Sequence, residues 1–333
     1  MRKPSYATAL LVLLLSALNL LGGTPAHAAD NGSWSVFPYA TELAQRPYFY
    51  LSADPGDALR DKVVVANKTA QPLTFRLYAA DAYNTARDGG FAVRTRTERQ
   101  RGVGVWARPA RTRVTVPGHG KVTVPVTIRV PRGAEPGDHP GAIVALDERV
   151  AASDGSLALG VRQAVAARVY LRVSGPTMPA IAVEDVRVDQ HRPVVPGTGD
   201  STAVISYTLH NRGNVTLDPA VRLRADGLFG RTLVSRGLTG LPSELLPRQR
   251  VRLTARWSGA PQFDWGDVTL TASARQTRES ASTSFVAMPW LVVAVLAGVL
   301  VVGAVLLRVR QVRGRDRVGH VDAPRVVVRS TAR

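Results

Sequence analysis

The sequence predicts an all-β exported protein with two tandem immunoglobulin-like β-sandwiches and one C-terminal transmembrane helix. Three observations predict this fold class. Short alternating β-branched runs, bounded by Pro, Gly, Asn and Asp, recur through residues 30–286, and nothing there sustains a helical period. A stretch of twenty residues without a charge occupies 288–307. The 333 residues include no cysteine, so packed cores rather than disulfides must hold the sandwiches together.

The N-terminus has the pattern of a secretory signal peptide. Arg2 and Lys3 precede an apolar run at 7–21, and a small-x-small triplet follows at 26–28. This pattern predicts that residues 1–28 are removed and that the rest of the chain is exported.

The apolar stretch 288–307 predicts a transmembrane helix, because twenty residues rising about 1.5 Å each span a hydrocarbon core of about 30 Å. Pro289 suits the first helical turn, and Trp290 suits the lipid interface. The tail, 308–333, carries eight arginines against two aspartates, so the positive-inside rule places it in the cytoplasm. The predicted localisation is the cell membrane, single-pass type I, with the N-terminal part extracellular.

The net charge of +18 is high, but the predicted export argues against nucleic acid as a partner. Outside a bacterium the available polyanions are anionic lipids, sugars and teichoic acids. GC-rich codon usage is the alternative explanation, because 39 of the 43 basic residues are arginine and the chain is rich in Ala, Val, Gly and Pro. The lack of cysteine favours a bacterial source.

Two exported domains are predicted, at 30–175 and 180–285, because a proline-rich segment at 175–179 separates two strand-rich regions. The strands expected within them include 62–66, 73–78, 113–116, 121–130, 203–210, 251–257 and 267–274.

The two predicted domains repeat one order of elements. Residues 63–81 and 205–226 each contain a strand, a turn opened by Asn67 or Asn211, and a second strand. Asparagine suits such a turn because it tolerates left-handed backbone and caps its own main chain. The repeated order predicts sandwiches of the same kind.

Several loose motifs in the first predicted domain occur in a characteristic order. They are WSVFPYATE at 34–42, YFYLSADPGD at 48–57, the strand and turn at 63–67, AYNTARDGGF at 82–91, PGHGKVTVPVTIRVP at 117–131 and PGDHPGAIVAL at 136–146. Together they resemble the peptidoglycan-binding domain of the WxL-interacting protein family of Gram-positive surface proteins. The resemblance covers most of residues 34–173, and its specificity lies in the order of the motifs.

This resemblance implies a signal peptide, a peptidoglycan-binding sandwich, a second sandwich, a transmembrane helix and a basic tail. The composition, rich in Arg and Ala, is that of an actinobacterial-type member. The second predicted domain is short and only loosely similar to the family's host-binding domain. The resemblance therefore does not imply that this chain binds host matrix proteins.

No local motif indicates catalysis, a cofactor or a metal, since HExxH, P-loop and GxSxG patterns are all missing from the sequence. Asp147 and Glu148 are adjacent on a predicted strand and point to opposite faces, so they cannot flank one glycosidic bond. A solvated strand end is expected there. Asp264 and Asp267 are expected to form a turn rather than a calcium site. The chain is therefore predicted not to be an enzyme.

The segment 82–106 is the candidate wall-binding surface, because it combines aromatic rings with guanidinium groups. Its candidate residues are Tyr83, Asn84, Phe91, Arg94, Arg96, Arg99, Arg101 and Trp106. Sugar rings present apolar faces to aromatic rings, while carboxylates and phosphates accept the forked donors of arginine. The alternative is an exposed hairpin with Trp106 in the core.

Other aromatic residues are expected to serve packing. Tyr48 and Tyr50 share one strand face and are expected in the core, which leaves Phe49 on the exposed face. Trp257 and Trp265 are expected to fill the core of the second predicted domain.

These patterns predict a non-enzymatic cell-surface protein that binds peptidoglycan or associated anionic wall polymers through its first extracellular domain. Weak multivalent contacts would suffice, because the membrane anchor raises the effective concentration. The alternative is a membrane-anchored scaffold that binds another surface protein without contacting glycan.

Overall fold

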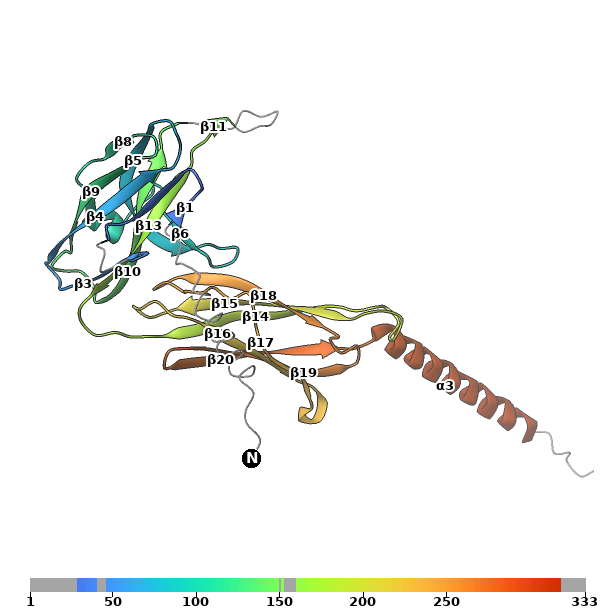
Figure 1. Ribbon diagram of the computed structural model, residues 1–333. Coiled ribbons are helices and arrows are strands. Elements are labelled where there is room, and N and C mark those ends of the chain that lie inside the picture. The colour runs from blue at the N-terminus through green and yellow to red at the C-terminus, as the bar shows by residue number, and fades with distance from the viewer. Residues whose placement is uncertain (1–28, 41–45, 150, 153–159, 319–333) are drawn as a thin grey trace, which may run out of the picture.

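The computed structural model describes residues 29–40, 46–149, 151–152 and 160–318. The predicted signal peptide and the end of the basic tail lie outside the described residues. The described chain is mostly β-structure and has a single long apolar helix at its C-terminal end (Figure 1). The expected all-β class with one C-terminal helix is therefore confirmed.

The first sheet pair extends from β1 to β13. One sheet has the order β1 (Ala29–Asp30), β2 (Trp34–Pro38), β4 (Ala58–Asn67), β9 (Lys121–Arg129) and β7 (Ala107–Pro109). The other has the order β3 (Phe49–Ala53), β13 (Ala164–Val173), β10 (Gly137–Asp147), β5 (Leu73–Asn84) and β6 (Phe91–Val93), with β8 (Arg113–Val116) also paired to β5. A short helix, α2 (Val103–Trp106), and a small hairpin, β11 (Ala151–Ala152) and β12 (Gly160–Val161), complete it.

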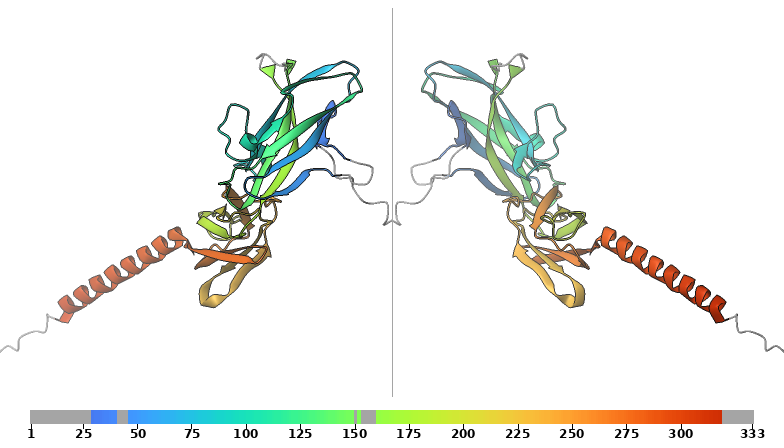
Figure 2. Two further views of the ribbon diagram at one scale, coloured as in Figure 1. Left: turned by 90° about the vertical axis from the view of Figure 1, so that its left-hand side faces the viewer. Right: turned by 90° about the vertical axis from the view of Figure 1, so that its right-hand side faces the viewer.

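The second sheet pair extends from β14 to β20. One sheet has the order β14 (Ile181–His191), β15 (Thr202–Asn211) and β18 (Arg250–Ser258). The other has the order β17 (Thr232–Gly237), β16 (Ala220–Asp226), β19 (Asp264–Ala274) and β20 (Thr277–Ala287), with the 3-10 turn η1 (Leu228–Gly230) after β16. Figure 2 shows α3 (Trp290–Val318) leaving this pair and projecting away from the first.

Each sheet pair encloses its own hydrophobic core, because its strands alternate apolar and polar residues. Strand β18 is buried at every second position, and its arginines occupy the positions between. The rings of Trp34 and Phe75, 5.3 Å apart, pack in the first core. In the second core Trp257 lies edge-to-face with Phe285 at 5.7 Å.

The expected core role is confirmed for Trp257 and wrong for Trp265. Trp257 is 4% exposed, whereas Trp265 is 45% exposed. The cause is the phase of β19, in which Asp264 takes the first buried position and alternation turns Trp265 outward.

Six strands of each sheet pair follow the same connectivity. The order β2-β4-β9 corresponds to β14-β15-β18, and the sheet containing β5, β10 and β13 corresponds to the one containing β16, β19 and β20. Asn67 and Asn211 end the corresponding strands β4 and β15. The repeated order of elements expected from the sequence is therefore present in the sheets.

Asn211 shows why asparagine ends both strands. Its Nδ2 donates to the carbonyl oxygens of Val215 at 2.7 Å and Leu245 at 2.9 Å, and its Oδ1 accepts the amide of Gly213. The side chain thus pairs main-chain groups at the end of the strand, among them Leu245 O, which also accepts the amide of Leu217.

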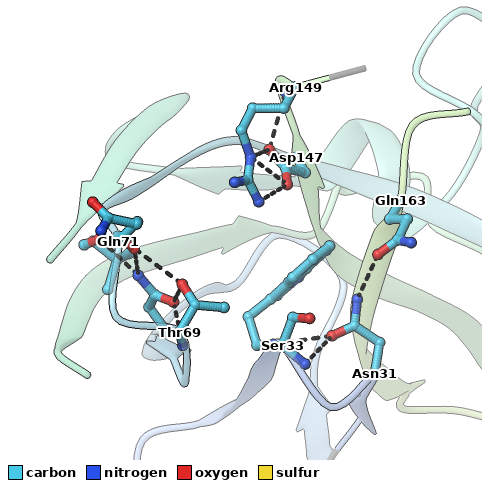
Figure 3. A network of polar contacts seen from close by, with 10 residues as sticks. Asn31, Ser33, Thr69, Gln71, Asp147, Arg149 and Gln163 are labelled. Carbon is cyan, nitrogen blue, oxygen red and sulfur yellow. Dashed lines mark hydrogen bonds and ion pairs between the residues drawn. The ribbon is translucent and has the colours of Figure 1, made fainter. Parts of the chain in front are cut away.

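Asn67 makes the equivalent bonds in the first sheet pair. Its Nδ2 donates to Gln71 O at 2.7 Å and Val116 O at 3.2 Å, and its Oδ1 accepts the amide of Thr69 at 2.9 Å. Thr69 and Gln71 are drawn in Figure 3. The predicted turn-opening role of both asparagines is confirmed.

The adjacent carboxylates at the end of β10 have different partners. Glu148 pairs with Arg76 at 3.1 Å and Arg113 at 2.6 Å. Asp147 pairs with Arg149 at 2.8 Å, as Figure 3 shows, and is 5% exposed rather than solvated. The expected solvated strand end is wrong at this residue, because Asp147 takes an inward strand position and the guanidinium compensates its burial.

Helix α3 carries the predicted membrane span. The candidate span, Trp290–Gln311, has 22 residues and contains an 18-residue window with a mean hydropathy of 2.9 and no burial against the rest of the described chain. This helix is long and apolar enough to cross a membrane. It continues beyond 307 to Val318, which fits the high helix propensity of the arginines there.

Candidate functional site

The predicted binding segment, 82–106, folds back over the outer face of the sheet that contains β5. Strand β6 pairs with the end of β5, and α2 returns the chain to the first core. The covered face holds a small apolar cluster of Ala80, Ala142 and Val144, with Tyr78 and Val93 packed against it. The segment is therefore a hairpin that covers this apolar cluster.

Asn84 is a buried link between the two sheet pairs and is not an accessible ligand contact. The side chain is 5% exposed. Its Nδ2 donates to Gly89 O at 2.6 Å and Glu244 O at 2.8 Å, and its Oδ1 accepts the amide of Leu246 at 2.8 Å. All its polar atoms are engaged in holding the loop against the second sheet pair.

Trp106 belongs to the first core, so the core alternative is confirmed for this residue. It is 9% exposed, and its ring lies 4.6 Å from the His139 ring. Helix α2 positions it by turning the chain inward immediately before β7.

Phe91 and Tyr83 are half-buried, and arginines already cover part of their rings. The Arg168 guanidinium lies 4.3 Å from the Phe91 ring centroid, and that of Arg94 lies 5.7 Å from the Tyr83 centroid. These cation–π contacts take up ring surface on which a sugar would stack. The aromatic half of the predicted site is thus largely structural.

The four predicted arginines line two hollows on either side of the loop 94–101. The junction hollow, of about 450 Å³, is lined by Arg94, Arg99, Arg101, Asp81, Glu135, Asp138, His139 and, from the second sheet pair, Asn214 and Arg248. The outer hollow, of about 370 Å³, is lined by Arg76, Arg96, Arg113, Leu146, Glu148 and Arg162.

Each carboxylate of the junction hollow already has a partner. Glu135 pairs with Arg248, and Asp138 accepts Arg172 Nε at 2.7 Å. Asp81 accepts main-chain amides from the loop, including that of Gly104 at 2.7 Å.

Apart from Arg248, which pairs with Glu135, the guanidinium groups of the same hollow are less engaged. Arg94 has a 3.7 Å ion pair with Glu98 besides its cation–π contact with Tyr83. Within the described chain, the guanidinium groups of Arg99 and Arg101 have no hydrogen-bond or ion-pair partner. The hollow therefore presents free donors to a bound anion.

The outer hollow has four arginines against one glutamate. Glu148 is shared by Arg76 and Arg113, whereas Arg96 and Arg162 have no ion-pair partner among residues 29–318 that the structure describes. Burial raises the pKa of nearby Tyr78, and Arg96 partly opposes this rise, so the phenol stays protonated at neutral pH. The hollow is cationic and suits phosphate or carboxylate.

The sequence reasoning missed Arg76, Arg113, Arg162 and Arg248, which the fold brings to the same two hollows. Strand alternation puts Arg76 and Arg113 on the outer face of the sheet, and this placement could have been predicted from the sequence. Their register beside Glu148 and the distant contribution of Arg248 depend on tertiary packing.

The expected orientation of the aromatic triplet at 48–50 is wrong, because its inward and outward faces are exchanged. Phe49 is 1% exposed and lies in the core, whereas Tyr50 is 61% exposed on the outer face. Only one of the alternating faces of β3 meets the opposing sheet, and Phe49 occupies it. The Tyr50 ring stacks on Tyr170 at 5.4 Å, and Tyr48 lies edge-on to both.

Glu244 of the second sheet pair holds this tyrosine cluster in place. It accepts Arg168 Nη1 at 2.6 Å and the Tyr170 hydroxyl at 3.0 Å. Burial is the largest cause that raises the pKa of Tyr170 to about 12, so the hydroxyl remains a donor at neutral pH. The cluster connects the candidate site to the second sheet pair.

The junction between the sheet pairs is held by main-chain contacts as well. Asn214 Nδ2 donates to Pro136 O at 2.9 Å, and Asp138 Oδ2 accepts the amide of Thr216 at 2.7 Å. Gly137 has φ +119°, and an added Cβ would lie 2.2 Å from Asn214 O. Only glycine fits this approach, so the contact between the two sheet pairs at this point depends on it.

Metal ligands are not gathered in the part of the chain that the structure describes, where no group of three or more His, Asp or Glu side chains is placed to hold an ion. Asp264 is 1% exposed and accepts the amide of Leu228 at 2.8 Å and Arg231 Nη2 at 2.9 Å. Its oxygens fasten a loop. The chemistry available at the two hollows is anion binding by arginine.

Comparisons with known proteins assign no family to the chain. No family model matches it, and no curated protein matches it. Solved structures with some likeness include the class 5 fimbriae chaperone CfaA, at 10% identity over 76% of this chain and 100% of that chain, with a TM-score of 0.33. The CsuC–CsuE chaperone-tip adhesion subunit complex of Acinetobacter baumannii pili is 11% identical over 71% of this chain and 94% of that chain, with a TM-score of 0.34.

A family 123 glycoside hydrolase from Clostridium perfringens is also similar in part. It is 12% identical, and the match covers 42% of this chain and 27% of that chain with a TM-score of 0.29. All these likenesses are too distant to carry a conclusion about function.

Proposed function

We propose that this chain is a non-enzymatic, membrane-anchored surface protein that binds peptidoglycan or its attached polyanions through the first sheet pair. The observation that carries the proposal is the pair of arginine-lined hollows on either side of the loop 94–101. Arg96, Arg99, Arg101 and Arg162 supply donors there that no carboxylate of the described chain occupies. Wall phosphates and carboxylates are acceptors of the matching kind.

The domain organisation we propose is two tandem immunoglobulin-like sandwiches, 30–175 and 180–285. Its support is the repeated strand connectivity, the separate cores and the equivalent bonds of Asn67 and Asn211. We propose that α3 crosses the cell membrane once, with the sheet pairs outside, because the arginine-rich tail follows its apolar part.

Charge rather than ring stacking dominates the proposed binding mode. Trp106 and Asn84 are buried, and the rings of Phe91 and Tyr83 are partly covered, so the accessible groups are guanidiniums. Contacts of this kind are individually weak and screened by salt. Repeated acceptor groups on a polymer and the membrane anchor add to the affinity by raising the effective concentration.

Replacing Arg96 and Arg99 together with glutamine is expected to weaken binding to purified cell walls roughly tenfold to thirtyfold. The change removes one donor group from each hollow, and two exposed ionic contacts at about 1 kcal/mol each correspond to this range. Co-sedimentation of the full chain, held in detergent micelles, with purified walls measures the dissociation constant.

The matched control replaces Arg129 and Arg252 with glutamine, which lowers the charge equally at exposed positions outside both hollows. We expect its affinity to stay within about twofold of the unmodified chain. Equal weakening by both double variants would show that net charge alone drives binding, and the proposed site would be wrong.

A scaffold for another surface protein is the second candidate function. The tyrosine cluster favours it, because Tyr50 lies on the edge strand β3 and lines a hollow of about 490 Å³ together with Pro140 and Tyr170. Exposed aromatic residues at a sheet edge suit a protein partner.

A further inference from the structure

Exposed apolar residues of the second sheet pair gather at one end. Between β14 and β20, the large apolar side chains that are exposed are Val194, Val195, Phe229, Phe263, Trp265 and Val286. Scattered exposed apolar residues are ordinary on a protein surface, but a cluster of them marks an interaction site. This cluster lies at the end of the second sheet pair from which α3 leaves.

Strand pairing places Trp265 and Val286 beside the start of α3. The two residues are register partners on β19 and β20, so their side chains share the outer face of the sheet. Trp265 is 45% exposed and Val286 is 57% exposed. Strand β20 ends at Ala287, and α3 begins at Trp290. Phe263 immediately precedes β19 and lies 6.4 Å from the Trp265 ring.

Phe229 projects from the loop after β16 at the same end. The Leu228 amide donates to Asp264 Oδ1 at 2.8 Å, which ties this loop to the start of β19. Phe229 is fully exposed, at 101%, and has a left-handed backbone with φ 57°. A phenylalanine rarely adopts this backbone, and here it holds an apolar ring clear of the protein surface.

Val194 and Val195 lie on the connection between β14 and β15, which Figure 1 shows beside the start of α3. Val194 and Trp290 line a common hollow of about 250 Å³. Gly197 N donates to Gln262 Oε1 at 2.7 Å, so this connection is also fastened to the loop before Phe263. Three separate loops thus present apolar side chains around one helix start.

The opposite end of the second sheet pair has a different character. Its turns carry Asn211, Asn214 and Glu244, which bond to main chain or to the first sheet pair. None of the large apolar side chains exposed between β14 and β20 lies there. The exposed apolar side chains between β14 and β20 thus lie at the end from which α3 leaves.

We propose that Val194, Val195, Phe229, Phe263 and Trp265 form a lipid-contact collar that rests in the headgroup region of the membrane entered by α3. The inference rests on the membrane anchor of the proposed function. Aromatic and aliphatic side chains of segments that lie on a membrane insert about 5–10 Å into the boundary between headgroups and acyl chains, where tryptophan is favoured. The collar would orient the second sheet pair on the membrane and direct the first toward the wall.

The absence of cysteine from the sequence allows a direct test with single labelled sites. Phe229→Cys and Phe263→Cys are each labelled with an environment-sensitive fluorophore in the full chain, reconstituted in vesicles of phosphatidylcholine and phosphatidylglycerol. Ser243→Cys, exposed at the opposite end, is the aqueous control, and Leu300→Cys within α3 reports insertion. We expect both collar labels to emit at shorter wavelength than the Ser243 label and to be quenched by lipids with a nitroxide near the headgroup.

Two outcomes would overturn the collar, and they are distinguishable. If the Leu300 label is quenched by deep nitroxides while both collar labels match Ser243, α3 is inserted and the collar is wrong. If the Leu300 label is also aqueous, the anchor itself is wrong, and the collar is wrong with it. Neither result alters wall binding by the arginine hollows, which is measured in micelles.

Discussion

Replacing Asn211 with alanine is expected to lower the free energy of unfolding by about 3 kcal/mol. The side chain is fully buried, and its loss leaves the carbonyl of Val215 and the amide of Gly213 unpaired, while the carbonyl of Leu245 keeps only the amide of Leu217. Each buried polar group left unpaired costs about 1–3 kcal/mol, and partial access of water reduces the sum. Urea unfolding of the full chain in micelles, followed by circular dichroism, measures the change.

The matched variants for this prediction are Asn67→Ala and Asn31→Ala. Asn67 makes the equivalent bonds and is 3% exposed, so a loss similar to that of Asn211 is expected in the first sheet pair. Asn31 also accepts main-chain amides, but at an exposed turn, so its loss should cost less than about 1 kcal/mol. Similar small effects in all three variants would contradict the stabilising role of the two buried asparagines.

Replacing Asp264 with alanine is expected to cost about 2–3 kcal/mol of unfolding free energy. This carboxylate is 1% exposed and accepts the amides of Leu228 and Trp265, both at 2.8 Å, together with Arg231 at 2.9 Å. Without it the loop that carries Phe229 loses its attachment to β19. Urea unfolding at pH 7 measures the loss.

The pH dependence of stability tests the same carboxylate. Burial acts to raise the pKa of Asp264, but the hydrogen bonds from Leu228, Arg231 and Trp265 outweigh it and hold the pKa below its usual value. A lowered folded pKa contributes stability above the unfolded pKa of about 4, and this contribution is lost as the pH falls through the folded pKa. The unmodified chain should therefore lose more stability on acidification below about pH 4 than Asp264→Asn. Parallel curves for the two proteins would rule out this role.

Period-two alternation was sufficient to predict the strands and the β class. The expected runs, from 62–66 to 267–274, lie within strands, except that 121–130 extends one residue past the end of β9, because each buries one face against an opposing sheet. The apolar length of α3 was equally readable, since it requires no tertiary information. Which residues at a strand end face the core could not be predicted, as Phe49 and Trp265 show, because it depends on which single residue meets the opposing sheet.

The candidate site was only partly predictable. Composition identified the arginines of the loop 94–101, but it could not show that Asn84 and Trp106 are buried by contacts with distant segments. The opposing arginines Arg76 and Arg248 come from another strand and from the second sheet pair. The resemblance to WxL-interacting proteins stays a prediction, because no family model matches the chain.

Binding of the full chain to purified cell walls as a function of salt tests the central claim most directly. At low ionic strength the chain should co-sediment with walls, and the affinity should fall at least tenfold towards 1 M salt, where the screening length shortens to about 3 Å. Salt-insensitive binding would contradict recognition by arginine. Absence of wall binding at low salt, with stoichiometric capture of one surface protein instead, would contradict the wall-binding function and favour the scaffold.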